Sequence, residues 1–190
     1  MTEIQGNVQL NNDINLELIG QKSIRRSSRK SKRSIKKEEE ENILTKILNK
    51  CEDGLKVVHM GEKGRGVMAV KEFKKGDFIV EYAGELINIS EAKQREEKYA
   101  NDQDKGCYMY YFNCNNRKYC IDATDESGRL GRLVNHSKTK CNSRTRLIVH
   151  NDFMYLILVA SRDISIGEEL LYDYGDRNQE TLISHPWLKS

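Results

Sequence analysis

The sequence predicts a mainly β domain with short helices. From Leu55 onward, short runs of β-branched and aromatic residues are separated by turns that contain glycine or asparagine, which is typical of short strands. Few stretches carry helix signals, and the single proline, Pro186, lies near the end of the sequence. A sequence of 190 residues is long enough for one sizeable domain with extensions.

A helix is expected over residues 36–50, within a capping segment that spans 35–54. Glutamates lie near its start and lysines near its end, as the helix dipole prefers. Asp53-Gly54 then ends the helix. The apolar residues at helical spacing are Ile43, Leu44, Ile47 and Leu48.

Short strands follow. Runs of valine, isoleucine and aromatic residues predict strands at 57–58, 67–70 and 78–82. Charged residues and glycine at 62–64 and 74–77 predict the turns between them.

A second helix is expected over residues 91–100. Ser90 is the residue predicted to cap its N-terminus. Glu91 and Arg95 lie one helical turn apart, so we expect them to pair.

A hairpin is predicted next, from strands at 108–113 and 117–122. Its turn falls at Asn115-Asn116, because asparagine tolerates the left-handed turn conformation.

A further strand pair is expected at 147–149 and 154–160. Residues 70–80 and 161–171 share a pattern of basic, apolar, glycine and acidic positions, which predicts two similar β units and no longer repeat array.

Charge is distributed unevenly. Residues 22–37 contain nine basic side chains and no acidic one, so the net charge of +3 leaves −6 for the remainder. A basic, serine-rich segment without aromatic residues buries too little surface to offset ordering entropy, and we expect a disordered arm over residues 1–34. This arm is either a solvated tail or a segment for nuclear import and DNA-phosphate contact.

Cysteine spacing and hydropathy exclude several classes of protein. The five cysteines follow no Cys-x-x-Cys framework, which favours reduced thiols and predicts no metal site. No apolar run is long enough to span a bilayer, and residues 1–20 lack the basic start and apolar run of a secretory leader.

Two polar-rich runs point to a functional site. Gly131–Ser137 brings amide, imidazole and hydroxyl groups together after an apolar pair, and Glu168–Gly175 contains Tyr172 and Tyr174. Residues two apart in an extended segment point to the same face. Taken singly, Asn-His-Ser is commonly a turn and Tyr-x-Tyr is commonly a half-buried strand. Only the two runs together indicate a functional site.

A third motif, Gly64-Arg65-Gly66-Val67 followed by 78–82, completes an ordered set. Gly-x-Gly, Glu-Tyr-x-Gly, Arg-Leu-x-Asn-His-Ser and Gly-Glu-Glu-Leu-x-x-Asp-Tyr-Gly, in this order, resemble a SET-domain lysine methyltransferase. The runs at 106–112 and 185–189 are similar to the branch that monomethylates lysine-20 of histone H4. The resemblance covers residues 52–190.

The resemblance implies several small sheets around a pseudoknot-like core. The SET domain would span 55–175, and a C-terminal segment at 176–190 would cover the cofactor. In this family the chain end threads beneath the segment that holds Asn135 and His136. Residues 138–152 differ from the branch in length and sequence, which leaves recognition of the substrate's flanking residues open.

The resemblance also implies S-adenosyl-L-methionine as methyl donor and S-adenosyl-L-homocysteine as product. Methyl transfer from a sulfonium to an amine is an in-line displacement that needs alignment, exclusion of water and an uncharged amine. Neutralising a free lysine at pH 7 costs about 4.6 kcal/mol. An apolar channel lined by tyrosines lowers that cost by disfavouring the ammonium form.

Site residues are assigned by matching the family's motifs. Tyr174 matches the catalytic tyrosine, and Tyr172 and Tyr82 match the other tyrosines of the lysine channel. Tyrosine rather than phenylalanine at position 172 implies monomethylation. The positions that match cofactor contacts are Lys63, Gly64 and Arg65 at the amino-acid end, Asn135 and His136 at the adenosine end, Trp187 on the adenine, and Tyr108 as a further donor-contacting tyrosine, with Arg132 in support.

The predicted function is therefore monomethylation of lysine-20 of histone H4 on nucleosomes, by a monomeric protein of the nucleus and chromosome. Three alternatives remain: methylation of another histone or non-histone lysine, a non-catalytic chromatin-binding module, and a nucleic-acid-binding protein driven by residues 22–37. Substrate range, preference for nucleosomes and regulation lie beyond the sequence.

Overall fold

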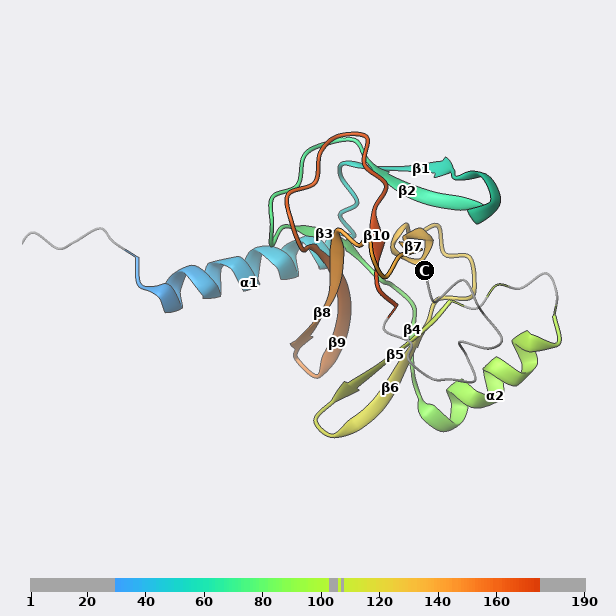
Figure 1. Cartoon of the computed structure of the whole chain (residues 1–190). Helices are drawn as coiled ribbons and strands as arrows, with labels where there is room; N and C mark the ends of the chain where they lie inside the picture. Colours follow the sequence, from blue (N-terminus) through green and yellow to red (C-terminus); the bar gives the residue numbers. More distant parts are fainter. Residues whose placement is uncertain (1–29, 103–105, 107, 175–190) are drawn as a thin grey trace, which may run out of the picture.

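The computed structural model describes residues 30–102, 106 and 108–174. Strands and short helices build the body, and α1 projects from one side of it (Figure 1). The elements are α1 (Lys32–Leu48), β1 (Leu55–His59), η1 (Gly61–Lys63), β2 (Arg65–Ala69), β3 (Phe78–Glu81), β4 (Glu85–Asn88), α2 (Ile89–Ala100), β5 (Met109–Cys114), β6 (Arg117–Asp122), η2 (Gly131–Leu133), β7 (Asn135–His136), β8 (Ser143–His150), β9 (Phe153–Ala160) and β10 (Leu171–Tyr172).

Three small sheets organise these strands. β1 pairs with β2; β3, β9, β8, β10 and β7 form a five-stranded sheet in that order; and β4, β6 and β5 form a three-stranded sheet. The predicted fold class, mainly β with short helices and several small sheets, is confirmed. In the part of the chain that the structure describes, we find no helix with the length and hydropathy to cross a membrane.

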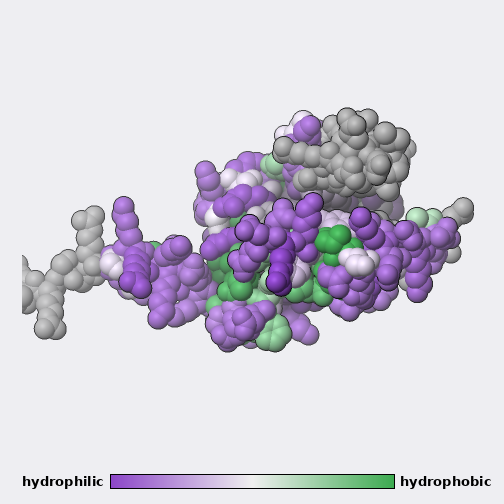
Figure 2. Space-filling model, turned by 90° about the horizontal axis from the view of Figure 1, so that it is seen from below, coloured by the Kyte–Doolittle hydropathy of each residue, from purple (hydrophilic) through white to green (hydrophobic). Residues whose placement is uncertain are grey.

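Helix α1 begins earlier and ends earlier than predicted. The hydroxyl of Ser31 accepts a hydrogen bond from the backbone N–H of Ser34 at 3.1 Å and caps the helix, which therefore begins four residues before the predicted start. Ile43 and Ile47 are the buried residues of the helix, as their spacing predicted. Hydrophilic side chains cover the face of α1 that Figure 2 shows, which suits a helix held by one short apolar stripe.

Helix α2 begins two residues before the predicted start. The side chain of Asn88 accepts a hydrogen bond from the backbone N–H of Glu91 at 3.0 Å, so Asn88 is the N-cap. The prediction of Ser90 as the cap is wrong, because asparagine at the end of β4 offers an acceptor earlier. The predicted pair forms: Arg95 donates to Glu91 at 2.6 Å.

The predicted β5–β6 hairpin is confirmed, whereas the predicted bounds of β8 in the second strand pair are too short. Asn115 and Asn116 adopt positive φ angles of 50° and 61°, and they join β5 to β6 as predicted. Strand β8 is longer than its apolar run at 147–149 and begins at Ser143. Its polar first half was missed because those residues pair in register with β9 and with β10, which a local apolar pattern does not reveal.

The two units with similar sequences pair with each other. Phe73 and Ile164 exchange backbone hydrogen bonds of 3.0 and 2.8 Å. A glycine with positive φ follows in each unit, at Gly76 (95°) and Gly167 (88°). Glycine adopts this conformation without steric cost, so the shared pattern encodes two matching turns.

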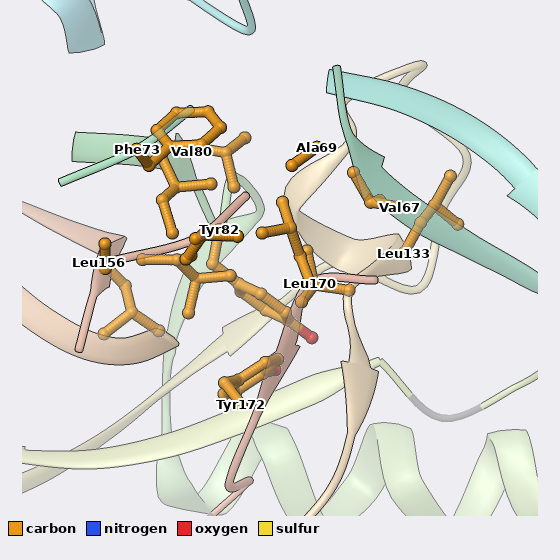
Figure 3. Close-up of a cluster of buried hydrophobic side chains, with 14 of the residues drawn as sticks. Val67, Ala69, Phe73, Val80, Tyr82, Leu133, Leu156, Leu170 and Tyr172 are labelled. Atoms are coloured by element: carbon orange, nitrogen blue, oxygen red, sulfur yellow. The ribbon is translucent and has the colours of Figure 1, made fainter. Parts of the chain in front are cut away.

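The main core lies where these units meet the central sheet. Figure 3 shows the phenol rings of Tyr82 and Tyr172 beside the aliphatic side chains of Val80, Leu156 and Leu170. A second cluster joins α1 to the sheet: Ile43 and Ile47 pack with Phe78, Ile157 and Val159. The central sheet is therefore buried on one side by the main core and on the other by α1.

Ile47→Ala tests the anchoring of α1. Ile47 is 3% exposed, so its truncation is expected to lower the free energy of unfolding by about 2–4 kcal/mol. Leu48 is 66% exposed on the same helix turn, and Leu48→Ala is the control, with an expected change within about 0.5 kcal/mol. Chemical denaturation measures both, and equal effects would contradict the packing.

Candidate active site

Parallel pairing of β10 with β7 brings the two motif-bearing segments together. Leu171 lies opposite Asn135, and Tyr172 lies opposite His136. Ser143 strengthens this junction, because its hydroxyl donates to the carbonyl of Leu171 at 2.9 Å. Segments far apart in the sequence therefore share one small region at the centre of the molecule (Figure 1).

Four tyrosines gather beside this junction. We call Tyr82, Tyr110, Tyr172 and Tyr174 the phenol cluster. The ring of Tyr172 lies 4.6 Å from that of Tyr174, 6.2 Å from that of Tyr110 and 6.4 Å from that of Tyr82. Tyr172 is only 2% exposed. The cluster is thus an aromatic wall with Tyr172 at its buried centre.

Tyr110 is a member that the sequence reasoning missed. Its phenol oxygen lies 2.9 Å from the hydroxyl oxygen of Thr145 on β8, and its ring lies 5.9 Å from that of Tyr82. The sequence contained a signal for it: Tyr110 and Phe112 of β5 alternate with Tyr108, which directly precedes the strand, and all three pack against the core.

Hydrogen bonds fix the orientation of the flanking phenols. Tyr82 donates to the carbonyl of Tyr108 at 3.0 Å, and Tyr174 donates to the carbonyl of Val134 at 3.1 Å. The rings are therefore held by backbone groups of neighbouring segments.

His136 orients Tyr174 through its ring. The Nδ1 atom accepts a hydrogen bond from the backbone N–H of Tyr174 at 3.1 Å, and the two rings meet edge-on at 5.0 Å. In this contact Nδ1 is the acceptor, so Nε2 is the ring nitrogen that is left to donate. The geometry thus gives this side chain a positioning role.

A pocket opens beside Tyr174 and has a volume of about 350 Å³, within the range of small-molecule sites. It unites most of the predicted cofactor residues. Its lining residues are His59, Lys63, Gly64, Arg65, Tyr108, Arg132, Leu133, Asn135 and Tyr174. Of the lining residues, Tyr174 also belongs to the phenol cluster, so it stands where the pocket meets the aromatic wall.

Residues 64–175 match the SET domain, which is more than half of the sequence. The chain belongs to the SET-domain family. The family identified from the four motifs is thereby confirmed.

Several relatives of this SET domain are enzymes by name. It is 55% identical over 167 residues to the N-lysine methyltransferase KMT5A of Xenopus tropicalis, covering 88% of this chain and 49% of the relative. It is 49% identical to the histone-lysine N-methyltransferase Set8 of Drosophila melanogaster (87% and 24% covered). It is 47% identical to the histone-lysine N-methyltransferase set-1 of Caenorhabditis elegans (87% and 69% covered). The chain spans about half the length of the KMT5A proteins it matches.

A solved structure shares the fold. The crystal structure of CpSET8 from Cryptosporidium matches with a TM-score of 0.67 and 43% identity, over 74% of this chain and 67% of that one.

Arg132 supports the pocket of this SET domain from below the surface. It is 4% exposed, and its guanidinium donates to the carbonyls of Ala123 and Thr124 at 2.6 and 2.9 Å. The guanidinium carbon lies 3.8 Å from the ring centre of Tyr108. Arg132 therefore holds the Tyr108 ring by a cation–π contact.

Glu126 links Arg132 to the pocket rim. Arg65 donates to both carboxylate oxygens of Glu126 at 3.1 and 2.9 Å, and Arg132 donates to one at 2.6 Å. Hydrogen bonding from Arg65, then from Arg132, lowers the pKa of Glu126 to about 2. The carboxylate remains ionised over the physiological range and keeps Arg65 at the mouth of the pocket.

Burial sets the protonation of the SET-domain phenols. Desolvation raises the pKa of Tyr172 well above the ordinary value of 10.0, and it also raises the pKa values of Tyr174 and Tyr110. All three phenols are neutral at physiological pH. The phenol cluster therefore offers hydrogen-bonding groups without a negative charge.

Two sequence-based assignments fall elsewhere. Trp187 and residues 22–29 of the basic run at 22–37 lie outside the described residues, whereas residues 32–37 of that run belong to α1. Across residues 30–102 and 108–174, no group of three or more His, Cys, Asp or Glu side chains is arranged to hold a metal ion.

Alkaline unfolding tests the burial of Tyr172. Its folded pKa lies above the unfolded value of about 10, so the unfolded state loses its proton first as pH rises. Stability due to this group is complete below pH 10 and falls by up to about 1.4 kcal/mol per pH unit above it.

Tyr172→Phe is expected to make the loss of stability above pH 10 shallower by that contribution. Denaturation curves from pH 8 to pH 11 measure it, and the pH 8 values separate any change in packing. Identical slopes in both proteins would contradict the assignment.

Proposed function

We propose that this chain is an S-adenosylmethionine-dependent protein-lysine N-methyltransferase that monomethylates lysine-20 of histone H4 on nucleosomes. The observation that carries this proposal is the junction of the 350 Å³ pocket with the phenol cluster at Tyr174. A donor in the pocket and a lysine along the aromatic wall would meet there. The relatives named as lysine and histone-lysine methyltransferases support the reaction class.

The pocket residues suit a zwitterionic nucleoside donor. Lys63 and Arg65 bring positive charge for a carboxylate, and the face of Tyr108 and the side chain of Leu133 bring apolar surface for the remainder. Gly64 has a φ of 75°, a conformation in which side chains are strained. When bound, S-adenosylmethionine supplies an electrophilic methyl group on a sulfonium.

The chain's own residues prepare the acceptor amine. The rings of Tyr82, Tyr110 and Tyr172 exclude water and disfavour the charged ammonium form. Tyr174, held by Val134 and by the ring of His136, would direct the amine toward the pocket. No group in this scheme has to act as a covalent nucleophile.

Product specificity would rest on Tyr172. Its ring is enclosed by the three other members of the phenol cluster, and its hydroxyl would hold a water molecule where a second methyl group would need room. The matching position in related enzymes holds either tyrosine or phenylalanine, and tyrosine implies monomethylation.

The proposed setting is the nucleus and chromosome, with the histone H4 tail as substrate. The basic run at 22–37 would contact DNA phosphate, and Trp187 would cover the adenine ring. S-adenosyl-L-homocysteine is the second product.

Tyr172→Phe is expected to yield dimethyllysine, because loss of the hydroxyl frees room beside the amine. Mass spectrometry of an H4 peptide after extended reaction measures the product. Monomethyllysine as the sole product of both proteins would remove Tyr172 from this role.

Tyr174→Phe is expected to lower turnover by about 100-fold or more, because the group that orients the amine is lost. Binding of S-adenosylhomocysteine, measured by calorimetry, should stay within about threefold of the wild type. Near-normal turnover would show that Tyr174 is dispensable.

The experiment that tests the function itself is transfer of a labelled methyl group to recombinant nucleosomes. Incorporation is expected with wild-type H4 and not after replacement of its lysine-20. Equal labelling of both would indicate another lysine, and absence of labelling, with intact nucleosome binding, would indicate a non-catalytic chromatin module.

A further inference from the structure

One carboxylate joins two walls of the pocket. Oε1 of Glu169 accepts a hydrogen bond from Nδ2 of Asn135 at 3.0 Å, and Oε2 accepts one from Nζ of Lys63 at 3.2 Å. Asn135 and Lys63 line the pocket, whereas Glu169 is not among the lining residues. Glu169 therefore acts on the pocket through its two partners.

The backbone holds Glu169 firmly behind the pocket. It forms a β-bridge with Met68 of β2, and the next residue, Leu170, donates to the carbonyl of Val67 at 2.8 Å. The carboxylate side chain is only 20% exposed. Its position is thus set by the pairing of this segment with β2 rather than by flexible surface contacts.

The carboxylate dictates which atoms Asn135 and Lys63 offer to a ligand. Only the amide nitrogen of Asn135 can donate to Glu169, so its carbonyl oxygen remains as an acceptor. Lys63 has three N–H donors and uses one of them to bind Glu169. Since both partners bind the same carboxylate, an acceptor and a cation lie at the same end of the pocket.

Gly66 leaves room for this arrangement. A Cβ atom at this position would lie 2.7 Å from Nδ2 of Asn135 and 3.4 Å from Oε1 of Glu169. The Asn135–Glu169 pair fits because β2 carries no side chain there.

We propose that Glu169 is a positioning residue that prepares Asn135 and Lys63 for the α-amino-acid end of the methyl donor. The carbonyl oxygen of Asn135 would accept from the α-ammonium, and Lys63 would pair with the α-carboxylate. The inference rests on the proposed function and deepens it. It places the Asn135 side chain at the amino-acid end, which leaves the backbone of β7 for the adenosine that the sequence motif suggested.

The test compares two ligands that differ only in that end. S-adenosylhomocysteine carries the amino-acid group, and 5′-methylthioadenosine lacks it. In Glu169→Met, calorimetry should show that the Kd for S-adenosylhomocysteine rises by about tenfold or more, while that for 5′-methylthioadenosine changes by less than about twofold.

The neighbouring glutamate supplies a matched control. Glu168 accepts from Arg162 at 2.6 Å and from the backbone N–H of Ser165 at 2.7 Å, away from the pocket-lining residues. Glu168→Met should leave both Kd values unchanged, even where thermal melts show a loss of stability.

Glu169→Gln guards against misfolding of the apolar variant. Glutamine has the same shape as glutamate but lacks the negative charge opposite Lys63. The Kd for S-adenosylhomocysteine is therefore expected to rise selectively by about threefold, less than in Glu169→Met. An equal loss for both ligands, or unchanged affinity for S-adenosylhomocysteine in both variants, overturns the proposal. A wild-type chain that binds neither ligand contradicts the proposed function itself.

Discussion

The parallel pairing of β10 with β7 is the contact on which the rest of the site depends. It sets Leu171 beside Asn135 and Tyr172 beside His136, although the two strands are very short. The neighbouring hydrophobic side chains compensate for the cost of closing this loop, because Leu170 and Val134 are fully buried next to it. This pairing therefore holds the pocket, the phenol cluster and the His136–Tyr174 hydrogen bond next to one another.

The β10–β7 pairing places two different environments, a polar pocket and an aromatic wall, beside each other. On one side, ionised and amide groups face a pocket of about 350 Å³. On the other, the phenol cluster forms an aromatic wall, in which the oxygens of Tyr82, Tyr110 and Tyr174 bond to backbone or to Thr145. A methyl transfer to an amine needs both, since charged groups fix the donor while apolar surroundings keep the amine uncharged. Tyr174 belongs to both environments, which explains why its backbone and its hydroxyl are each held.

The sequence predicted features that depend on local chemistry. Tandem asparagines specified the β5–β6 turn, and helical spacing identified Ile43 and Ile47 as the buried stripe of α1. The shared pattern at 70–80 and 161–171 predicted two similar β units, which pair with each other. The ordered motifs identified the family and most of the residues that line the pocket.

The features that were missed depend on contacts between distant segments. The polar half of β8 is a strand because β9 and β10 flank it, which no local pattern contains. Tyr110 counts as a site residue only when β5 is laid against Tyr82 and Tyr172. The sequence motifs assigned no site role to Glu169 itself, because its role follows from hydrogen bonds to residues 34 and 106 positions away.

The most direct measurement is a crystal structure of this chain with S-adenosylhomocysteine and a histone H4 peptide. The account predicts ligand density in the pocket lined by Lys63, Tyr108 and Asn135, and a lysine side chain that passes between Tyr82 and Tyr172 to end at Tyr174. Ligand density elsewhere, or a lysine that approaches from a direction without these phenols, would contradict it.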